Sequence, residues 1–187
     1  MKAEGRRQKE PAPVTGHRSP VTAFVALGSN LDDPPAQMRS ALRALAALPA
    51  TRLVRRSSFY RNPPEGGLDQ PDFVNAVAEI ETRLGPGELL ARLLEVERDH
   101  GRARGAPNAP RTLDLDIVLY GNQTVREADL AIPHPRMPGR AFVLVPLAEI
   151  APDAVVPGSG RVADLVRNVD ASGMIKLPDV ESKDGQD

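Results

Sequence analysis

The order of its apolar periods constrains the fold of this chain more than any other feature. Short apolar runs typical of strands alternate with segments in which apolar residues recur every three or four positions, as on one face of a helix. The predicted strands and helices follow the order β-α-β-β-α-β and cover residues 21–27, 33–48, 53–60, 73–80, 85–101 and 113–120. This order predicts an α+β, ferredoxin-like (βαββαβ) fold, an antiparallel sheet with helices on one face, followed by a C-terminal extension.

Turn and capping residues support the boundaries of the two helices. Asp33 and Pro34 supply an N-cap and a proline at the first helical position. Gly85-Pro86-Gly87 opens the second helix, and Gly101 follows its end. A further helix is predicted over residues 140–150, within the C-terminal extension.

Both ends of the chain differ in composition from its middle. Residues 1–20 are polar, charged and interrupted by prolines, and they lack an apolar period, which is typical of a disordered leader. Residues 169–187 end in a similar polar stretch and are expected to form a flexible tail. The folded unit is therefore expected to span residues 21–168, which is long enough for one hydrophobic core.

The charge balance and the absence of cysteine exclude several kinds of site. Lys and Arg number 24 against 25 acidic residues, a formal net charge of -1, so nothing indicates a nucleic-acid or membrane partner. A chain without cysteine forms no disulfide and no thiolate metal site. No apolar run approaches the roughly 18 residues that span a bilayer, and no signal peptide is evident, so a cytoplasmic location is expected.

The segment PRTLDLDIVLYG carries two carboxylates inside an apolar run. Side chains alternate faces on a strand, so Asp114 and Asp116 point to the side opposite Leu113, Leu115 and Ile117. Two residues of rise correspond to about 6.6 Å, a spacing from which both carboxylates can reach a shared divalent cation or a pair of them. The alternative is a solvent-facing strand with two acids, although strands disfavour aspartate.

Three arginines lie close to this acidic pair in the sequence. Arg111 directly precedes the strand, and Arg102 and Arg104 follow the second helix. Guanidinium groups bind phosphate oxygens through two parallel hydrogen bonds. Three cations beside an acidic pair favour a phosphate site over a solvated basic loop.

Glu97 and His134 each admit two interpretations. Glu97 continues the apolar stripe of the second helix and either emerges to solvent or accepts a hydrogen bond from a ligand. His134 lies between two prolines, near Arg136 and Arg140, and is either structural or a phosphate contact. The chain has no G-x-x-x-x-G-K-[ST] motif, so a P-loop is not expected to hold a nucleotide.

Several motifs, in their order along the chain, resemble the 6-hydroxymethyl-7,8-dihydropterin pyrophosphokinase family. They are ALGSNLDDP, SSFYRNPP, DQPDFVNAV, PRTLDLDIVLYG and the IPHPRM stretch that leads to Arg140, and they lie within about residues 21–157. The resemblance implies a monomeric kinase with a ferredoxin-like fold. It would transfer pyrophosphate from ATP to 6-hydroxymethyl-7,8-dihydropterin and release AMP, a step of tetrahydrofolate biosynthesis, so its partners would be these two small molecules.

The resemblance also assigns roles to individual residues. Two magnesium ions would be bound by Asp114 and Asp116, and catalysis would rest on Arg102, Arg111 and Asp116. The ATP-binding residues would be Glu97, Arg104, Ile117, His134 and Arg140. The pterin-binding residues would be Asn62, Pro63, Phe73, Asn75 and Phe142. The two phenylalanine rings, otherwise typical of a core, would stack on the pterin, and the Asn75 amide would pair with its edge.

Two departures from the family pattern fall in the expected loops. An Arg-Trp-Gly-Pro type of sequence usually precedes the last catalytic arginine, whereas residues 107–110 read Pro-Asn-Ala-Pro in a loop one residue shorter. Glu65 stands where a leucine often follows the two prolines. A family member with weakened catalysis is therefore one alternative. A non-enzymatic ferredoxin-like binding module is another, which an aromatic content of 3% disfavours.

Overall fold

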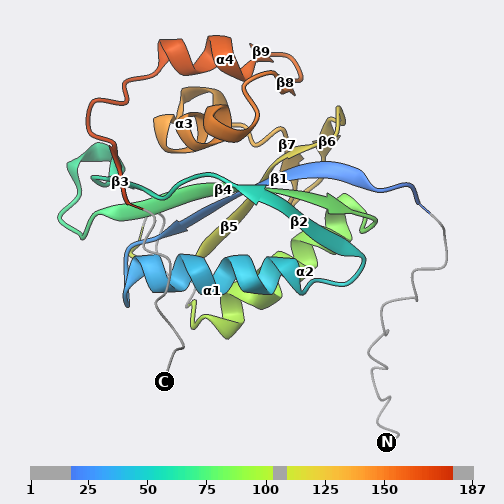
Figure 1. The fold of residues 1–187 in the computed structure, drawn as a ribbon, viewed down its shortest axis with the longest axis horizontal. Coiled ribbons are helices and arrows are strands. Elements are labelled where there is room, and N and C mark those ends of the chain that lie inside the picture. Colours follow the sequence, from blue (N-terminus) through green and yellow to red (C-terminus); the bar gives the residue numbers. More distant parts are fainter. Residues whose placement is uncertain (1–17, 103–108, 179–187) are drawn as a thin grey trace, which may run out of the picture.

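The computed structural model describes residues 18–102 and 109–178, which form an antiparallel sheet with helices on both faces (Figure 1). The strand order is β10-β3-β4-β1-β5, and β2 also pairs with β4. The strands of this sheet are β1 (Val21–Ser29), β2 (Thr51–Arg56), β3 (Tyr60–Asn62), β4 (Phe73–Thr82), β5 (Asp114–Tyr120) and β10 (Ile175–Lys176). The helices are α1 (Pro34–Ala46), α2 (Pro86–Asp99), α3 (Ala141–Ile150) and α4 (Val162–Leu165). Two separate hairpins are β6 (Val125–Arg126) with β7 (Ala131–Ile132) and β8 (Val155–Val156) with β9 (Gly160–Arg161).

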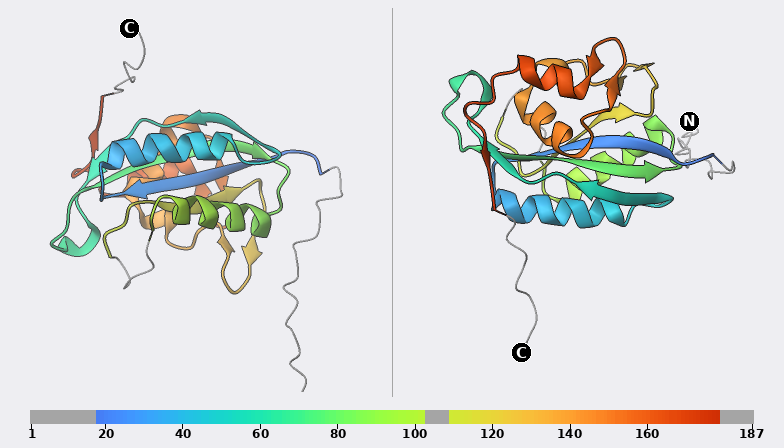
Figure 2. Two further views of the ribbon diagram at one scale, coloured as in Figure 1. Left: turned by 90° about the horizontal axis from the view of Figure 1, so that it is seen from below. Right: turned by 45° about the horizontal axis from the view of Figure 1, so that its top comes forward.

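The predicted βαββαβ arrangement with a C-terminal extension is confirmed. Helices α1 and α2 lie side by side on one face of the sheet, as expected, while α3 and α4 lie on the other (Figures 1 and 2). The extension therefore covers the face that the βαββαβ unit leaves open. No helix in the described part of the chain is both long and apolar enough to cross a membrane.

The central strands are buried on both faces because each face has its own hydrophobic core. On β1, Ala23, Val25 and Leu27 belong to the core beneath α1 and α2, whereas Phe24 belongs to the core beneath α3. Val77 on β4 likewise contributes to the core beneath α3. This two-sided burial explains why the strand at the start of the chain reads as a continuous apolar run rather than an alternating one.

The helix starts follow from local capping. Asp33 Oδ1 accepts a hydrogen bond from the Ala36 N–H at 3.2 Å, which confirms the predicted N-cap of α1. At the start of α2, the Glu88 carboxylate accepts a hydrogen bond from the Gly85 N–H at 2.7 Å. Both helices have proline in their first turn, where the missing N–H costs no hydrogen bond.

The single strand predicted over residues 53–60 is divided into β2 and β3. Ser57, fully buried between them, accepts a hydrogen bond through its hydroxyl from the Val77 N–H at 3.0 Å. The Ser57 N–H donates to the Val77 carbonyl at 2.9 Å. Because a side chain replaces a backbone acceptor at this position, the ladder with β4 is interrupted and the chain bends before β3 begins.

The C-terminal segment differs from the expected flexible tail over residues 169–187. Ile175 and Lys176 form β10 and pair with Arg61 and Tyr60 of β3. Beyond them, the Leu177 N–H donates to the Phe59 carbonyl at 2.8 Å, and its side chain packs against the core. An edge strand offers unpaired backbone groups to any extended segment nearby, and here the chain's own C-terminal part takes them. Of the expected leader, only residues 18–20 are described.

Candidate active site

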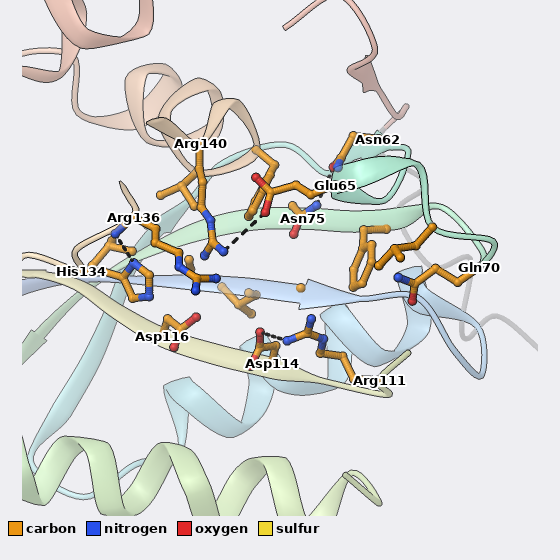
Figure 3. A pocket seen from close by; sticks show the side chains of 18 of the residues that line it. Asn62, Glu65, Gln70, Asn75, Arg111, Asp114, Asp116, His134, Arg136 and Arg140 are labelled. Atoms are coloured by element: carbon orange, nitrogen blue, oxygen red, sulfur yellow. Dashed lines mark hydrogen bonds and ion pairs between the residues drawn. The ribbon is translucent and has the colours of Figure 1, made fainter. Parts of the chain in front are cut away.

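A pocket of ≈ 300 Å³ opens on the face of the sheet that carries α3 (Figure 3). Strands β1 and β5 form its floor, and its walls are formed by β3, β4, the start of α3 and residues of three connecting segments, between β3 and β4, between α2 and β5, and between β7 and α3. The predicted site residues that line it are Asn62, Phe73, Asn75, Arg102, Arg111, Asp114, Asp116, His134, Arg140 and Phe142. Glu97, Ile117 and Pro63 do not line this pocket, and Arg104 lies outside the described residues. Residues far apart in the sequence thus converge on one cavity.

The carboxylate pair faces this pocket as the strand alternation predicts. Leu115 and Ile117 on the opposite side of β5 are buried in the core beneath α1 and α2, so neither residue turns its side chain toward the pocket. Opposite the two aspartates on β1 lie Gly28, paired with Asp114, and Ala26, paired with Asp116. Because these partners have little or no side chain, the floor beside the carboxylates is open to a ligand. The alternative of a solvent-facing strand is wrong.

The two aspartates differ in their neighbours. Asp114 is held by two arginines, through Oδ1 to Arg102 Nη1 at 2.5 Å and through Oδ2 to Arg111 Nη1 at 2.7 Å. Asp116 has no ion pair among residues 18–102 and 109–178. Burial, and next the charge of Asp114, raise the pKa of Asp116 to about 6, although Arg102, Arg140 and Arg111 act in the opposite direction. A cation bound at this pair would remove the cost of ionising Asp116.

The donor set fits magnesium bound together with a phosphate ligand. Magnesium takes oxygen ligands and is often held by one or two carboxylates, with substrate phosphates and water completing its shell. Asp114 and Asp116 supply two such carboxylates on one strand face. No cluster of three or more acidic, histidine or cysteine side chains suited to a metal exists within the described residues. Within the described residues, the pair therefore supplies only part of a magnesium shell.

Glu97 is buried behind the pocket and does not emerge to solvent. Its carboxylate accepts a hydrogen bond from the Leu115 N–H at 2.7 Å and pairs with Arg102. Burial raises the pKa of Glu97 to about 7, despite the opposing effects of the Leu115 N–H and of Arg102. Glu97 thus connects α2 to β5 and fixes Arg102, which itself reaches Asp114.

Two aromatic rings and two amides line the other end of the pocket. Phe73 and Phe142 each carry an arginine over the ring, Arg111 at 5.5 Å and Arg140 at 5.2 Å from the respective ring centre. The Asn75 amide donates to Asn62 Oδ1 at 2.6 Å, which fixes both amides beside the rings. This end of the pocket therefore offers apolar ring surfaces and fixed amide groups, which together suit a flat, polar heterocycle.

Pro63 packs in a different place from Asn62. A side chain at Gly173 would approach the Pro63 ring to 3.3 Å, so Pro63 lies against the C-terminal segment. Its side chain is therefore a contact between the loop after β3 and the end of the chain.

Asn30 organises three loops around the pocket, a role that the sequence did not indicate. It is buried, and its amide donates to Gln70 Oε1 and to the Pro71 carbonyl, both at 3.1 Å. Its Oδ1 accepts a hydrogen bond from the Arg111 N–H at 2.8 Å. In the sequence Asn30 is one residue of the ALGSNLDDP motif after the first strand, and its neighbours along the chain do not show which distant loops it will contact.

Several other lining residues were not predicted as site residues. They are Glu65, Leu68, Gln70 and Arg136 from the loops, with Val118 and Val143 among the apolar contacts. Glu65 forms an ion pair with Arg140 at 3.4 Å, and both residues line the pocket (Figure 3). The departure from leucine at this position thus places a carboxylate beside a predicted ATP-binding arginine.

Comparisons with known proteins agree on one family. Residues 24–152 match the family model described as 7,8-dihydro-6-hydroxymethylpterin-pyrophosphokinase (HPPK). A relative from Haemophilus influenzae, named 2-amino-4-hydroxy-6-hydroxymethyldihydropteridine pyrophosphokinase, is 50% identical over 157 residues, which cover 84% of this chain and 98% of the relative. A relative of the same name from Pseudomonas aeruginosa is 46% identical over 155 residues, 83% of this chain and 96% of the relative.

Solved structures show the same fold at low sequence identity. A Plasmodium falciparum HPPK-DHPS triple mutant with STZ-DHP superposes with a TM-score of 0.66 at 13% identity, covering 81% of this chain and 44% of that chain. The wild-type protein of the same organism gives a TM-score of 0.64 at 13% identity, with 81% and 45% covered. The chain therefore spans less than half of those solved chains.

Proposed function

The chain belongs to the 7,8-dihydro-6-hydroxymethylpterin-pyrophosphokinase family, and we propose that the pocket above β1 and β5 is its active site. The activity is transfer of pyrophosphate from ATP to 6-hydroxymethyl-7,8-dihydropterin, with release of AMP, in tetrahydrofolate biosynthesis. The observation that carries the site assignment is the union, in one cavity, of an acidic pair, a group of arginines and a ring-and-amide end. A phosphate chain and a flat heterocycle need these two chemistries next to each other.

The acidic end of the pocket would hold the nucleotide. Asp114 and Asp116 would bind two magnesium ions, which would neutralise phosphate charge and orient the reacting groups. Arg102 and Arg111 adjoin Asp114, from which they can also reach phosphate oxygens. His134 and Arg140 in the pocket would also contact the nucleotide, as would Arg104 and the backbone of Ile117. Glu97 would act indirectly, through its ion pair with Arg102. No side-chain contact to a nucleotide follows for Ile117, which is buried in the core.

The amide end of the pocket would hold the pterin. Asn75 lies on β4 with its amide fixed by Asn62, and Phe73 and Phe142 supply apolar surfaces. Asn62 lines this wall, and we assign to the backbone at Asn62 and Pro63 the contacts that read the edge of the ring. An amide can donate and accept at once, which suits an amino-oxo-pyrimidine edge.

The chemistry requires one bond to form and one to break. The hydroxymethyl oxygen attacks the β-phosphorus of ATP, and the bond from that phosphorus to the α–β bridging oxygen breaks, so that AMP leaves. Arg102 and Arg111 stabilise the negative charge that spreads over the phosphate oxygens. Asp116 is the aspartate of the pair without an ion-pair partner in the described residues, and we assign to it the proton lost by the hydroxymethyl group.

The direct test of the reaction is release of AMP from Mg-ATP and the pterin. We expect stoichiometric AMP and pyrophosphorylated pterin from the full chain, and no product when either substrate is left out. Lack of AMP above the enzyme-free background would overturn the activity. The same assay, in steady state, decides whether the shortened loop weakens catalysis, the alternative that remains within the family. The monomeric state is a separate proposal, checked by light scattering of the purified protein.

A further inference from the structure

Arg136 is the pocket arginine to which no role has been assigned. It lies on the loop between β7 and α3, at the corner where the short 3-10 turn Met137–Gly139 begins. Figure 3 shows its guanidinium pointing into the pocket, on the side where His134 and Asp116 lie. The residue itself is largely exposed, so a solvated surface arginine is the simple alternative.

The other three arginines of the pocket are already engaged by carboxylates of the chain. Arg102 pairs with Glu97 and Asp114, and Arg111 pairs with Asp114. Arg140 pairs with Glu65. Arg136 has no ion pair within residues 18–102 and 109–178. It is therefore the cation of this group whose charge is open to an incoming anion.

The backbone beneath Arg136 is held firmly although its side chain is exposed. Its N–H donates to His134 Nδ1 at 3.2 Å, and its carbonyl accepts a hydrogen bond from the Gly139 N–H at 3.3 Å. The next residue, Met137, is fully buried in the core beneath α3. The side chain thus extends into the pocket from an anchored turn, which limits the entropy lost when it binds.

The same hydrogen bond defines what His134 presents to the pocket. Because Nδ1 accepts from the Arg136 N–H, the proton of a neutral imidazole resides on Nε2, which is then a donor. Burial, with Arg140 and Arg136 nearby, lowers the pKa of His134, which favours the neutral ring. His134 and Arg136 therefore form a pair of donors on one corner, a neutral N–H beside a guanidinium.

We propose that Arg136 is a further nucleotide-binding residue, whose guanidinium contacts the phosphate chain of ATP beside the Nε2–H of His134. This inference rests on the proposed function of the pocket. It assigns to Arg136 a contact with the phosphates rather than with the adenine, the ribose or the pterin, because its free charge is the property that sets it apart from the other lining groups.

The test compares Arg136→Ala and Arg136→Lys with Arg126→Ala, each in the 187-residue chain. Arg126, on β6, is also exposed, has no ion pair in the described residues and does not line the pocket. The probes are α,β-methylene-ATP with magnesium, inorganic tripolyphosphate with magnesium, and the pterin alone, each measured by calorimetry. A charge-assisted hydrogen bond predicts that Arg136→Ala weakens both phosphate-bearing probes about tenfold, with partial recovery in Arg136→Lys.

The expected pattern includes unchanged pterin affinity in every variant and unchanged nucleotide affinity in Arg126→Ala. Equal nucleotide affinity of Arg136→Ala and Arg126→Ala would overturn the proposal. So would weaker binding of the nucleotide with tripolyphosphate binding unchanged, since the contact would then be to the nucleoside. If the wild-type protein releases AMP and Arg136→Ala binds both phosphate-bearing probes with wild-type affinity, only this inference fails. If the wild type releases none, the proposed function fails, whatever Arg136 does.

Discussion

Asp114 and Asp116 are two residues apart on one strand, yet they differ in their ion-pair partners among the described residues. Asp114 is neutralised by Arg102 and Arg111, whereas the pKa of Asp116 is raised to about 6 by burial and by the charge of Asp114. A raised carboxyl pKa means that the folded protein binds this proton more tightly than the unfolded chain does. Ionised Asp116 therefore destabilises the ligand-free protein, and the site keeps, at a cost in stability, the carboxylate to which we assign a role in catalysis.

Replacement of Asp116 by asparagine should expose this cost. In wild-type protein without metal, the contribution of Asp116 to stability is fully present below the unfolded pKa of 3.8, where both states are protonated, and should be lost as pH rises through the folded pKa of about 6. Asp116→Asn should abolish turnover and, at pH 8, raise the free energy of unfolding by about 1–3 kcal/mol. Urea denaturation in EDTA between pH 4 and 8 measures the difference. A stability difference that is the same at every pH would contradict this account.

Gly28 is needed because Asn75 approaches the backbone of β1 closely. A Cβ at Gly28 would lie 2.9 Å from Asn75 Oδ1, which is too short for an undisturbed contact. Gly28→Ala should displace the Asn75 amide and weaken pterin binding about tenfold or more, with a stability loss of about 1–3 kcal/mol. Affinity for α,β-methylene-ATP should change little. Gly87→Ala, where nothing lies within 4 Å, is the matched control, and a similar loss of pterin affinity in it would sink the explanation.

At the scale of elements, the loops around the pocket depend on Asn30 at the end of β1. Three of its hydrogen bonds join the turn before α1 to the loop before β4 and to the segment before β5. The position of the Arg111 backbone is thus set by a residue distant in sequence. Loops that share one buried amide are expected to move together rather than singly.

Substitution of Asn30 should therefore affect both stability and catalysis. Asn30→Ala leaves the Arg111 N–H without its acceptor and should cost about 2–4 kcal/mol of stability, with a fall in kcat because Arg111 loses its fixed position. Asn30→Asp retains that acceptor and loses only the amide donors, so it should keep more of kcat than Asn30→Ala does. Steady-state kinetics on both variants measure this. Equal kcat values would show that the Arg111 contact has no catalytic importance.

At the scale of the whole molecule, the sheet is stable because both of its faces are covered. The C-terminal extension supplies α3 and α4 to one face, and it then returns to add β10 to the edge (Figure 1). Glu149 on α3 holds this return in place, since it accepts hydrogen bonds from the Ser58 N–H and hydroxyl, from the Tyr60 hydroxyl and from Lys176. These bonds lower the pKa of Glu149 against the effect of its burial.

Removal of β10 should destabilise the fold more than its length suggests. A protein that ends at residue 173 loses the pairing with β3, the packing of Leu177 and the contact of Lys176 with Glu149. We expect a loss of about 1–3 kcal/mol, seen as a lower unfolding temperature in calorimetry. A protein that ends at residue 178 retains these contacts and is the control. Equal unfolding temperatures of the two proteins would show that β10 does not contribute.

Much of the architecture followed from local patterns in the sequence. The alternation in PRTLDLDI placed Asp114 and Asp116 on one face of a strand because the side-chain period of a strand is a property of the backbone. The N-cap at Asp33 and the glycine turns likewise depend on residues that are neighbours in the chain. Motif order then led to the family and to a set of site residues, most of which meet in one pocket.

Other features were decided by contacts between distant segments. Three of them join residues far apart in the sequence: the contact of the buried Ser57 with Val77, the Asn30 bridge to Arg111 and the Glu65–Arg140 pair. The fourth is the placement of Glu97 behind Arg102, which depends on how α2 meets β5. The sequence by itself determined the order of the βαββαβ elements and the face that the side chains of β5 occupy, because these depend on neighbours along the chain. Only the tertiary structure decided which charges pair among the described residues, because pairing depends on distances that exist only once the sheet and both helical layers have packed.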